Sequence, residues 1–206
     1  MAKPEIHLHQ GDLPEGLAFQ GSVAIDTETL GLNIQRDRLC LAQLSAGDGT
    51  AHLVQFDGSD YAAPRLKALL ADESVLKIFH FARFDVAVFE KNLGVTTTPI
   101  YCTKIASKLV RTYTDRHGLK DLCAELLGVE LSKQQQSSDW AAARLSQQQL
   151  AYAASDVLYL HGLKEKLDAM LERENRRAFA EAAFSFLPVR ARLDLAGFAE
   201  DDIFAH

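Results

Sequence analysis

Cysteine is scarce in this chain, and the three that occur, Cys40, Cys102 and Cys123, lie far apart in the sequence. An odd number of cysteines without a CxxC pair predicts neither a disulfide framework nor a zinc site. No apolar run approaches the roughly 20 residues that a membrane-spanning helix needs, and residues 1–14 lack the apolar stretch of a signal peptide. We therefore expect reduced core cysteines in a soluble, cytoplasmic protein without a membrane segment.

Positive charge is also in short supply. The formal net charge is −6, which argues against a protein that coats long nucleic acid by its overall field but permits a small anionic substrate. One stretch differs, because Lys104, Lys108 and Arg111 lie at the i, i+4 and i+7 positions of one helix face. This basic stripe has two interpretations, a solvated helix face or a surface that attracts phosphate.

The apolar residues that are present predict one domain over residues 1–206. The chain has 206 residues of which 48% are hydrophobic, enough for one sizeable core. Short runs rich in Val, Ile and Leu, separated by turn signals, predict strands at 5–10, 22–28, 38–46 and 50–56 that form a meander. A helix at 63–72, a buried strand at 75–81 and a helix at 82–94 form a crossover, which predicts a mixed sheet, and the pattern is helical from residue 103 onward.

Two acids stand at the end of the predicted strand at 22–28. Because a strand alternates its faces, Asp26 and Glu28 point the same way and their charges repel each other. The arrangement becomes favourable when a divalent cation such as Mg²⁺ or Mn²⁺ lies between them, since hard cations prefer oxygen ligands. By itself the pair favours the simpler interpretation of a solvated strand end, so a metal site requires further acids.

Further candidates come later in the chain. Asp85 lies in the first turn of a helix that follows a buried strand, where the helix dipole favours an anion. Tyr152 and Asp156 lie four residues apart on one face of another helix, for which Ser146 and Gln149 predict a capping box. Taken singly, Asp85 also fits an ordinary first-turn acid, and the Tyr–Asp pair also fits structural packing.

The ordered set is more informative than its parts. "DTET", "HFARFD" and "YAASD" resemble the three motifs of the DEDD 3′-5′ exonucleases, in the subclass that carries a tyrosine in the third motif. The flanking stretches "HGLKDL" and "SDWAAARLSQQQLAYAASDVLYL" are similar to those of ribonuclease D, so the resemblance covers about residues 20–165. The second motif departs from the family pattern at Phe81, where a small or amide residue is usual, and Arg83 is not diagnostic.

The resemblance implies a fold, a cofactor and a set of roles. The fold would be a ribonuclease H-like α/β domain, with a mixed five- to six-stranded sheet flanked by helices and a helical C-terminal half that ends in the segment 166–206. Asp26 would bridge two divalent cations, Glu28 and Asp156 would complete the shell of the first, and Asp85 would hold the second largely through water. Tyr152 would position the attacking water, and two cations about 4 Å apart would stabilise both the nucleophile and the leaving oxygen.

Substrate size is a separate matter. Long ribonuclease D proteins carry helical nucleic-acid-binding domains after the nuclease, and we expect no room for them in the 50 residues after Asp156. The chain in this respect resembles the short alphaproteobacterial nanoRNase C group, which degrades RNA dinucleotides and assembles as a ring-like octamer. In the dinucleotide-specific oligoribonucleases a leucine six residues after the first metal acid wedges between the bases, and Leu32 occupies that position; a turn residue packed on the sheet is the alternative. The other substrate-binding candidates are His80, His117 and Lys120.

We accordingly expect short RNA as the partner molecule, with other single-stranded 3′ ends as a further possibility, and a homo-oligomer that could be an octamer. Two alternatives remain open: a general 3′-5′ exonuclease acting on longer RNA or DNA ends, and an inactive exonuclease fold used as a binding module. The second is disfavoured because inactive copies usually lose a metal acid. The apolar tail, with Phe198 and Phe204, fits either oligomer contacts or folding back on the core.

Overall fold

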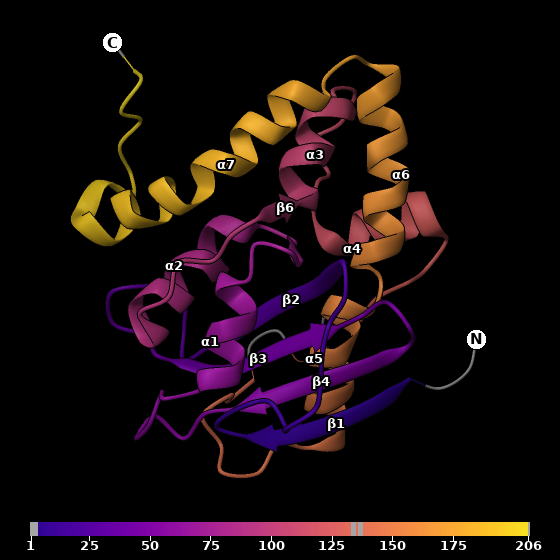
Figure 1. Cartoon of the computed structure of the whole chain (residues 1–206). Coiled ribbons are helices and arrows are strands. Elements are labelled where there is room, and N and C mark those ends of the chain that lie inside the picture. The colour runs from indigo at the N-terminus through magenta and orange to yellow at the C-terminus, as the bar shows by residue number, and fades with distance from the viewer. Residues whose placement is uncertain (1–3, 133–134, 136–137, 206) are drawn as a thin grey trace.

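The computed structural model describes residues 4–132, 135 and 138–205, and this described part is built on a mixed sheet of six strands (Figure 1). The spatial order is β1-β4-β3-β2-β5-β6. The strands are β1 (Glu5–Gln10), β2 (Ser22–Thr29), β3 (Leu39–Ser45), β4 (Thr50–Gln55), β5 (Leu76–Phe79) and β6 (Ile100–Cys102). Among these described strands β3 alone runs antiparallel to its neighbours.

The first four strands lie where the sequence predicts them, but the predicted meander is wrong in one respect. Strand β1 does not pair with β2; it pairs in parallel with β4 at the edge of the sheet. The reason lies in the burial pattern: Val23, Ala24 and Ile25 of β2 are all fully buried and suit a central strand, whereas β1 is part-exposed along its length and suits an edge. Strand β6 has three residues and falls just before the region that the sequence pattern assigns to helices.

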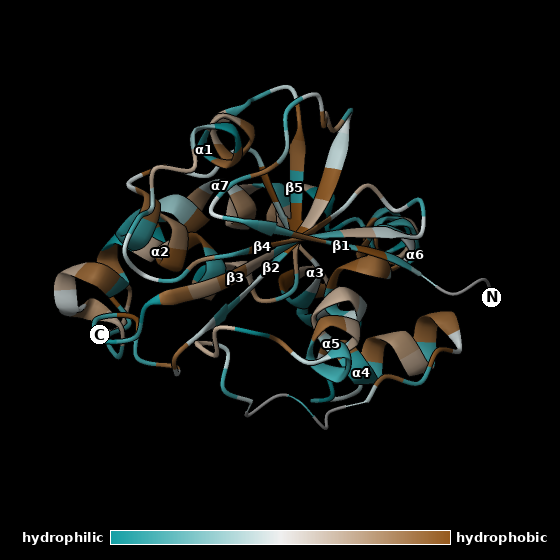
Figure 2. Cartoon of the chain, turned by 90° about the horizontal axis from the view of Figure 1, so that it is seen from below, coloured by the Kyte–Doolittle hydropathy of each residue, from teal (hydrophilic) through white to brown (hydrophobic). Residues whose placement is uncertain are grey.

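Helices cover both faces of the sheet, with α1 and α2 on one side and α5 on the other (Figure 2). The helices are α1 (Pro64–Ala71), α2 (Ala82–Leu93), α3 (Thr103–Val110), α4 (Leu119–Leu122), α5 (Gln147–Leu158), α6 (Leu160–Arg173) and α7 (Arg177–Leu193), with π-helical turns η1 (Cys123–Leu127) and η2 (Asp194–Phe198). No helix in the described ranges is long and apolar enough to cross a membrane. The predicted class, a mixed sheet flanked by helices with a helical C-terminal half, is confirmed.

Local signals place the helices that matter for the site. Helix α2 ends at Gly94, whose positive φ of 65° closes the last turn as its position in the sequence predicts. Helix α5 begins with the predicted capping box, in which Ser146 and Gln149 exchange hydrogen bonds. The three cysteines are free and buried, as expected.

The C-terminal segment folds back on α2. The guanidinium of Arg83, in the first turn of α2, donates to the buried Asp194 carboxylate from Nε at 2.5 Å and to the carbonyl of Ala199 at 2.6 Å. Arg190 of α7 also pairs with Asp194, at 2.8 Å. The backbone of η2 therefore folds back on the core, which is one of the two interpretations of the tail. The side chains of Phe198 and Phe204 are nevertheless 44% and 72% exposed.

Candidate active site

Three carboxylates meet where α5 packs on the sheet. Asp26 and Glu28 come from the second half of β2, and Asp156 comes from α5, which crosses β2, β3 and β4. One oxygen of each carboxylate lies within 4.8 Å of the others. Ligands of one Mg²⁺ with bonds of 2.0–2.1 Å are at most about 4.2 Å apart, so this donor set fits a hard divalent cation after a small adjustment.

The fourth acid lies beside this group. Asp85 is 3% exposed in the first turn of α2, and its Oδ1 accepts a hydrogen bond from the Thr27 hydroxyl at 2.6 Å. Thr27 stands between Asp26 and Glu28 on β2, so the strand that carries two of the acids also holds Asp85 in place. The structure thus brings Asp85 into the same cleft as the other three acids.

Burial and mutual repulsion change the protonation of the cluster. Burial raises the pKa of Asp26 to about 7. Burial and the charges of Asp26, Asp156 and Asp85 raise the pKa of Glu28 to about 10. The pKa values of Asp85 and Asp156 are also well above the ordinary range, first through burial and then through Asp26. Carboxylates this close hold protons unless cations replace them, so the cluster has the electrostatic character of a divalent-cation site.

Tyr152 lies on α5 one turn before Asp156 and lines the same cleft. Its ring packs against Trp140, with 6.0 Å between the ring centroids. Burial and the nearby acids raise the pKa of the phenol above its ordinary value. The hydroxyl is therefore protonated at neutral pH and can donate a hydrogen bond, but it is a poor proton acceptor.

The acids lie in a cleft of about 360 Å³. Leu32 lines its mouth and is 87% exposed, so it does not pack on the sheet as the alternative interpretation required. Phe81 lines the same cleft, has φ 71° in the left-handed region, and its ring centroid is 4.2 Å from the Lys104 ammonium. An aromatic ring and an aliphatic side chain at the rim of a cleft provide surfaces on which a base can stack.

The predicted substrate-binding residues divide into two groups. His80 and Lys120 line the cleft, whereas His117 is not part of its wall. The Nδ1 atom of His80 is 2.9 Å from the Thr103 hydroxyl, and burial followed by the Lys104 charge lowers the pKa of His80 to about 3. His80 is thus neutral at physiological pH, and its contact with a substrate would be that of an uncharged ring. His117 instead pairs through Nδ1 with Ser107 at 2.8 Å.

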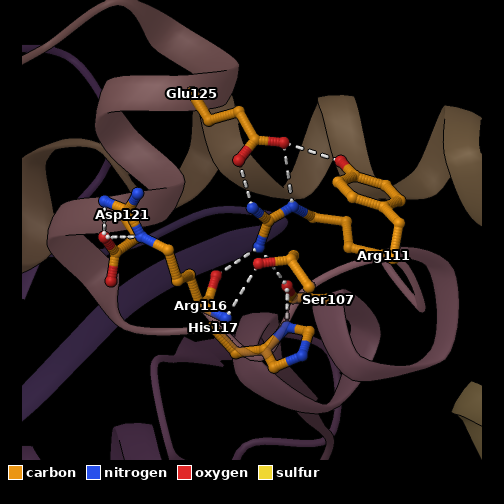
Figure 3. Close-up of polar contacts among 8 residues, drawn as sticks. Ser107, Arg111, Arg116, His117, Asp121 and Glu125 are labelled. Atoms are coloured by element: carbon orange, nitrogen blue, oxygen red, sulfur yellow. Dashed lines mark hydrogen bonds and ion pairs between the residues drawn. The ribbon is translucent and has the colours of Figure 1, made fainter.

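The basic stripe on α3 is not a continuous phosphate-binding surface, because Arg111 is buried. Its side chain is 0% exposed and forms an ion pair with Glu125, and its Nη1 donates to Ser107 and to the carbonyl of Arg116 at 2.6 Å (Figure 3). The guanidinium therefore joins the end of α3 to the segment 116–125. Lys104 lines the cleft and Lys108 is exposed, so the three basic side chains lie in three different environments.

The sequence did not assign Phe81 and Thr27 to the site, although both line the cleft. Phe81 appeared as a departure from the second motif, and its exposure of 44% beside the acids gives it a place in the cleft wall. The available signal is a large aromatic residue four positions before the motif acid Asp85, where the family usually has a small or amide residue. Thr27 gave no signal beyond its position between two acids, because a buried threonine of a strand is ordinary.

Comparisons with known proteins agree with this geometry. The family model for 3′-5′ exonucleases matches residues 12–172. The solved structure of Brucella melitensis NrnC bound to pGG has a TM-score of 0.95 and 60% identity over 98% of this chain and 99% of that one. The same protein with bound Mg²⁺ gives a TM-score of 0.94 and 59% identity, over 98% of this chain and 99% of that one. Ribonuclease D of Acidiphilium cryptum is 36% identical over 80% of this chain and 41% of its own length. The chain spans less than half the length of the curated relatives that it matches first.

Proposed function

Since the chain belongs to the 3′-5′ exonuclease family, as a ribonuclease D-like member of the DEDD group, we propose that it hydrolyses short RNA from the 3′ end. Dinucleotides are the proposed preferred substrate, and nucleoside 5′-monophosphates are the products. The observation that carries the proposal is the convergence of four acids and one tyrosine in a single cleft. The similarity to NrnC, solved with pGG, supports a short substrate.

In this proposal the acids would hold two divalent cations, Mg²⁺ or Mn²⁺: Asp26, Glu28 and Asp156 would hold one, and Asp26 and Asp85 would hold the other. Such cations supply positive charge for the transition state and lower the pKa of water. The chain's own contribution is to fix the acids on three elements, β2, α2 and α5, so that the ligand geometry is set by the fold. Thr27 holds the Asp85 carboxylate in place.

Tyr152 has a distinct role in the proposed reaction. Because its hydroxyl is neutral, it donates a hydrogen bond that orients water for in-line attack on phosphorus. The new bond joins the water oxygen to phosphorus and the bond from phosphorus to the 3′ oxygen breaks. The attacking water gives up one proton and the 3′ oxygen leaves as a hydroxyl after taking up one proton from solvent, so the reaction adds one water in all. The released 3′ nucleotide keeps the phosphate on its 5′ carbon.

The dinucleotide preference is supported by the size and chemistry of the cleft. A volume of about 360 Å³ is small for a long strand, and Leu32 and Phe81 offer apolar surfaces on which bases can stack. Lys104 and Lys120 supply positive charge in the cleft wall, and the buried Arg111 cannot extend it along α3. Affinity would then come from stacking and enclosure rather than from many phosphate contacts.

A length series tests the proposal. Purified protein with Mg²⁺ or Mn²⁺ is given 5′-labelled RNAs of two, three, five and seven nucleotides, each at low and high salt. Fastest cleavage of the two-mer with a shallow salt dependence is expected. Equal rates on two-mers and seven-mers with a steep loss of activity in salt would favour the general exonuclease, which the similarity to Ribonuclease D supports. An absence of cleavage of any RNA would favour the inactive binding module.

Leu32 can be tested against a neighbour. Leu32→Ala should slow cleavage of the two-mer more than cleavage of the seven-mer, whose additional phosphates provide compensating contacts. Leu30→Ala is the matched control, because Leu30 is 53% exposed two residues away and does not line the cleft wall. Equal effects of the two substitutions on the two-mer would contradict the wedge role.

We also propose a homo-oligomer, with the octamer as one form. The support is the apolar surface left at the C-terminal end, where Phe198, Ile203 and Phe204 are 44%, 45% and 72% exposed. Light scattering at micromolar concentration should give a multiple of 22.7 kDa, and the monomer mass would contradict the proposal. The cytoplasmic location stays a prediction.

A further inference from the structure

Gln43 is a buried amide in an otherwise apolar part of the sheet. It lies in the middle of β3 and is 0% exposed, between Ala42 and Leu44, which are also fully buried. In the register of the sheet Gln43 is the direct partner of Asp26 on β2. Side chains of directly paired residues project from the same face of a sheet, so the amide and the carboxylate face each other.

The hydrogen bonding of Gln43 is one-sided. Its Nε2 donates to Asp26 Oδ2 over 3.4 Å. Within the part of the chain that the structure describes, its Oε1 is buried without a hydrogen-bond partner. With cations bound the Asp26 carboxylate is ionised, and the opposite orientation of the amide would then place a carbonyl oxygen against it, which is repulsive, so the cation-bound site requires the N–H group to face Asp26.

This arrangement costs free energy that an apolar residue would not. A buried carbonyl without a hydrogen-bond partner destabilises a protein, and a methionine of nearly the same shape would fill the space without that cost. The stability of the fold therefore does not explain an amide at this position. The contact with Asp26 explains it, because Asp26 is the acid that the proposed function shares between two cations.

We propose that Gln43 is a positioning residue for the metal site, whose amide N–H holds Asp26 in the orientation that both cations need. The inference rests on the proposed function. The amide N–H and the Thr27 backbone N–H each take one acceptor position of the Asp26 carboxylate, and the other positions are left for cations. The donor is also neutral, so it favours the ionised carboxylate without placing a positive charge beside the cations, as lysine or arginine would.

The test is the affinity for Mn²⁺ without substrate, measured by titration calorimetry and by the electron paramagnetic resonance signal of free Mn²⁺. Gln43→Met should bind Mn²⁺ about 10- to 100-fold more weakly than the wild type. Its urea midpoint should be unchanged or higher, because the unsatisfied carbonyl is gone. RNA cleavage by Gln43→Met should need more Mn²⁺ to reach half its maximal rate, and that rate should rise toward the wild-type value at saturating Mn²⁺.

Gln55→Met is the matched control. Gln55 is a buried amide of the neighbouring strand β4, 6% exposed, and its Nε2 donates to the carbonyl of Ala142 at 2.9 Å rather than to a site acid. Its replacement should leave Mn²⁺ affinity unchanged. Should Gln43→Met not fold, Gln43→Leu provides the same test.

Wild-type Mn²⁺ affinity in a folded Gln43 variant would overturn the inference. An equal loss of Mn²⁺ affinity in Gln55→Met and Gln43→Met would also overturn it, because the loss would then reflect a general weakening of the fold. Failure of the proposed function is a different result, since it would appear in the wild type as Mn²⁺ binding without RNA cleavage.

Discussion

Removal of divalent cations should make the free energy of unfolding fall as the pH rises from about 6.5 to about 8, because the native acid cluster keeps protons that the unfolded chain releases. The folded pKa of Glu28 is about 10, above its ordinary value of 4.5. Between these two values the native carboxyl is protonated and the unfolded one is ionised. Rising pH therefore favours the unfolded chain throughout this interval, and Asp26 adds to the effect below its folded pKa of about 7.

The size of the effect follows from one retained proton. A proton held by the native state alone costs about 1.4 kcal/mol for each pH unit, so a rise of about 1.5 units costs about 2 kcal/mol. Bound cations replace the protons, which ionises the acids in both states and removes the slope. The cations also add the stabilisation expected from ligand binding to the native state alone.

Urea denaturation across this pH range, first with a chelator and then with Mg²⁺, measures how the free energy of unfolding changes with pH in the metal-free and the metal-bound protein. Comparison of the wild type with Glu28→Gln cancels the titration of the other groups, and the metal-free wild type should lose about 2 kcal/mol relative to this variant over the range. Glu15→Gln, at an exposed position, is the control and should follow the wild type. A metal-free wild type with the same pH slope as Glu28→Gln would refute the buried, proton-retaining cluster.

Three further predictions concern single residues. Tyr152→Phe should lower kcat roughly 100-fold in single-turnover assays with unchanged Mn²⁺ affinity, and a normal rate would contradict the role of the hydroxyl. Phe81→Gly should be about 1 kcal/mol more stable in urea than Phe81→Ala, since glycine takes the left-handed conformation freely; the reverse order would exclude backbone strain at this position. Arg111→Ala should destabilise the protein by about 3 kcal/mol, because it removes a buried ion pair whose partner Glu125 is half exposed; a loss of RNA binding without a loss of stability would restore the phosphate-binding role.

Local patterns predicted much of the fold and brought the right residues together. The strands of the first 56 residues, the stop at Gly94 and the capping box at Ser146 depend on neighbours in sequence, and each appears where predicted. The motif acids and Tyr152 also share one cleft, as the ordered motifs implied.

Features that depend on distant partners could not be read from the sequence. The pairing of β1 with β4 depends on which strand needs two neighbours, and β6 is too short to give a periodic signal. Arg111 has the spacing of a surface stripe, but its burial is fixed by Glu125 and by the carbonyl of Arg116, which approach only in the folded chain. The left-handed conformation of Phe81 is likewise a property of the turn between β5 and α2.

The acids of the cleft are contributed by β2, α2 and α5, three elements far apart along the chain. One ion joining α5 to β2 and another joining α2 to β2 would act as reversible cross-links, closing two long loops of polypeptide in a protein whose three cysteines are all unpaired. Closing a loop of this length by a covalent bridge is worth about 4 kcal/mol in chain entropy. The supply of divalent cations would then decide how firmly α5 is fastened to the sheet, as well as whether the cleft can act on RNA.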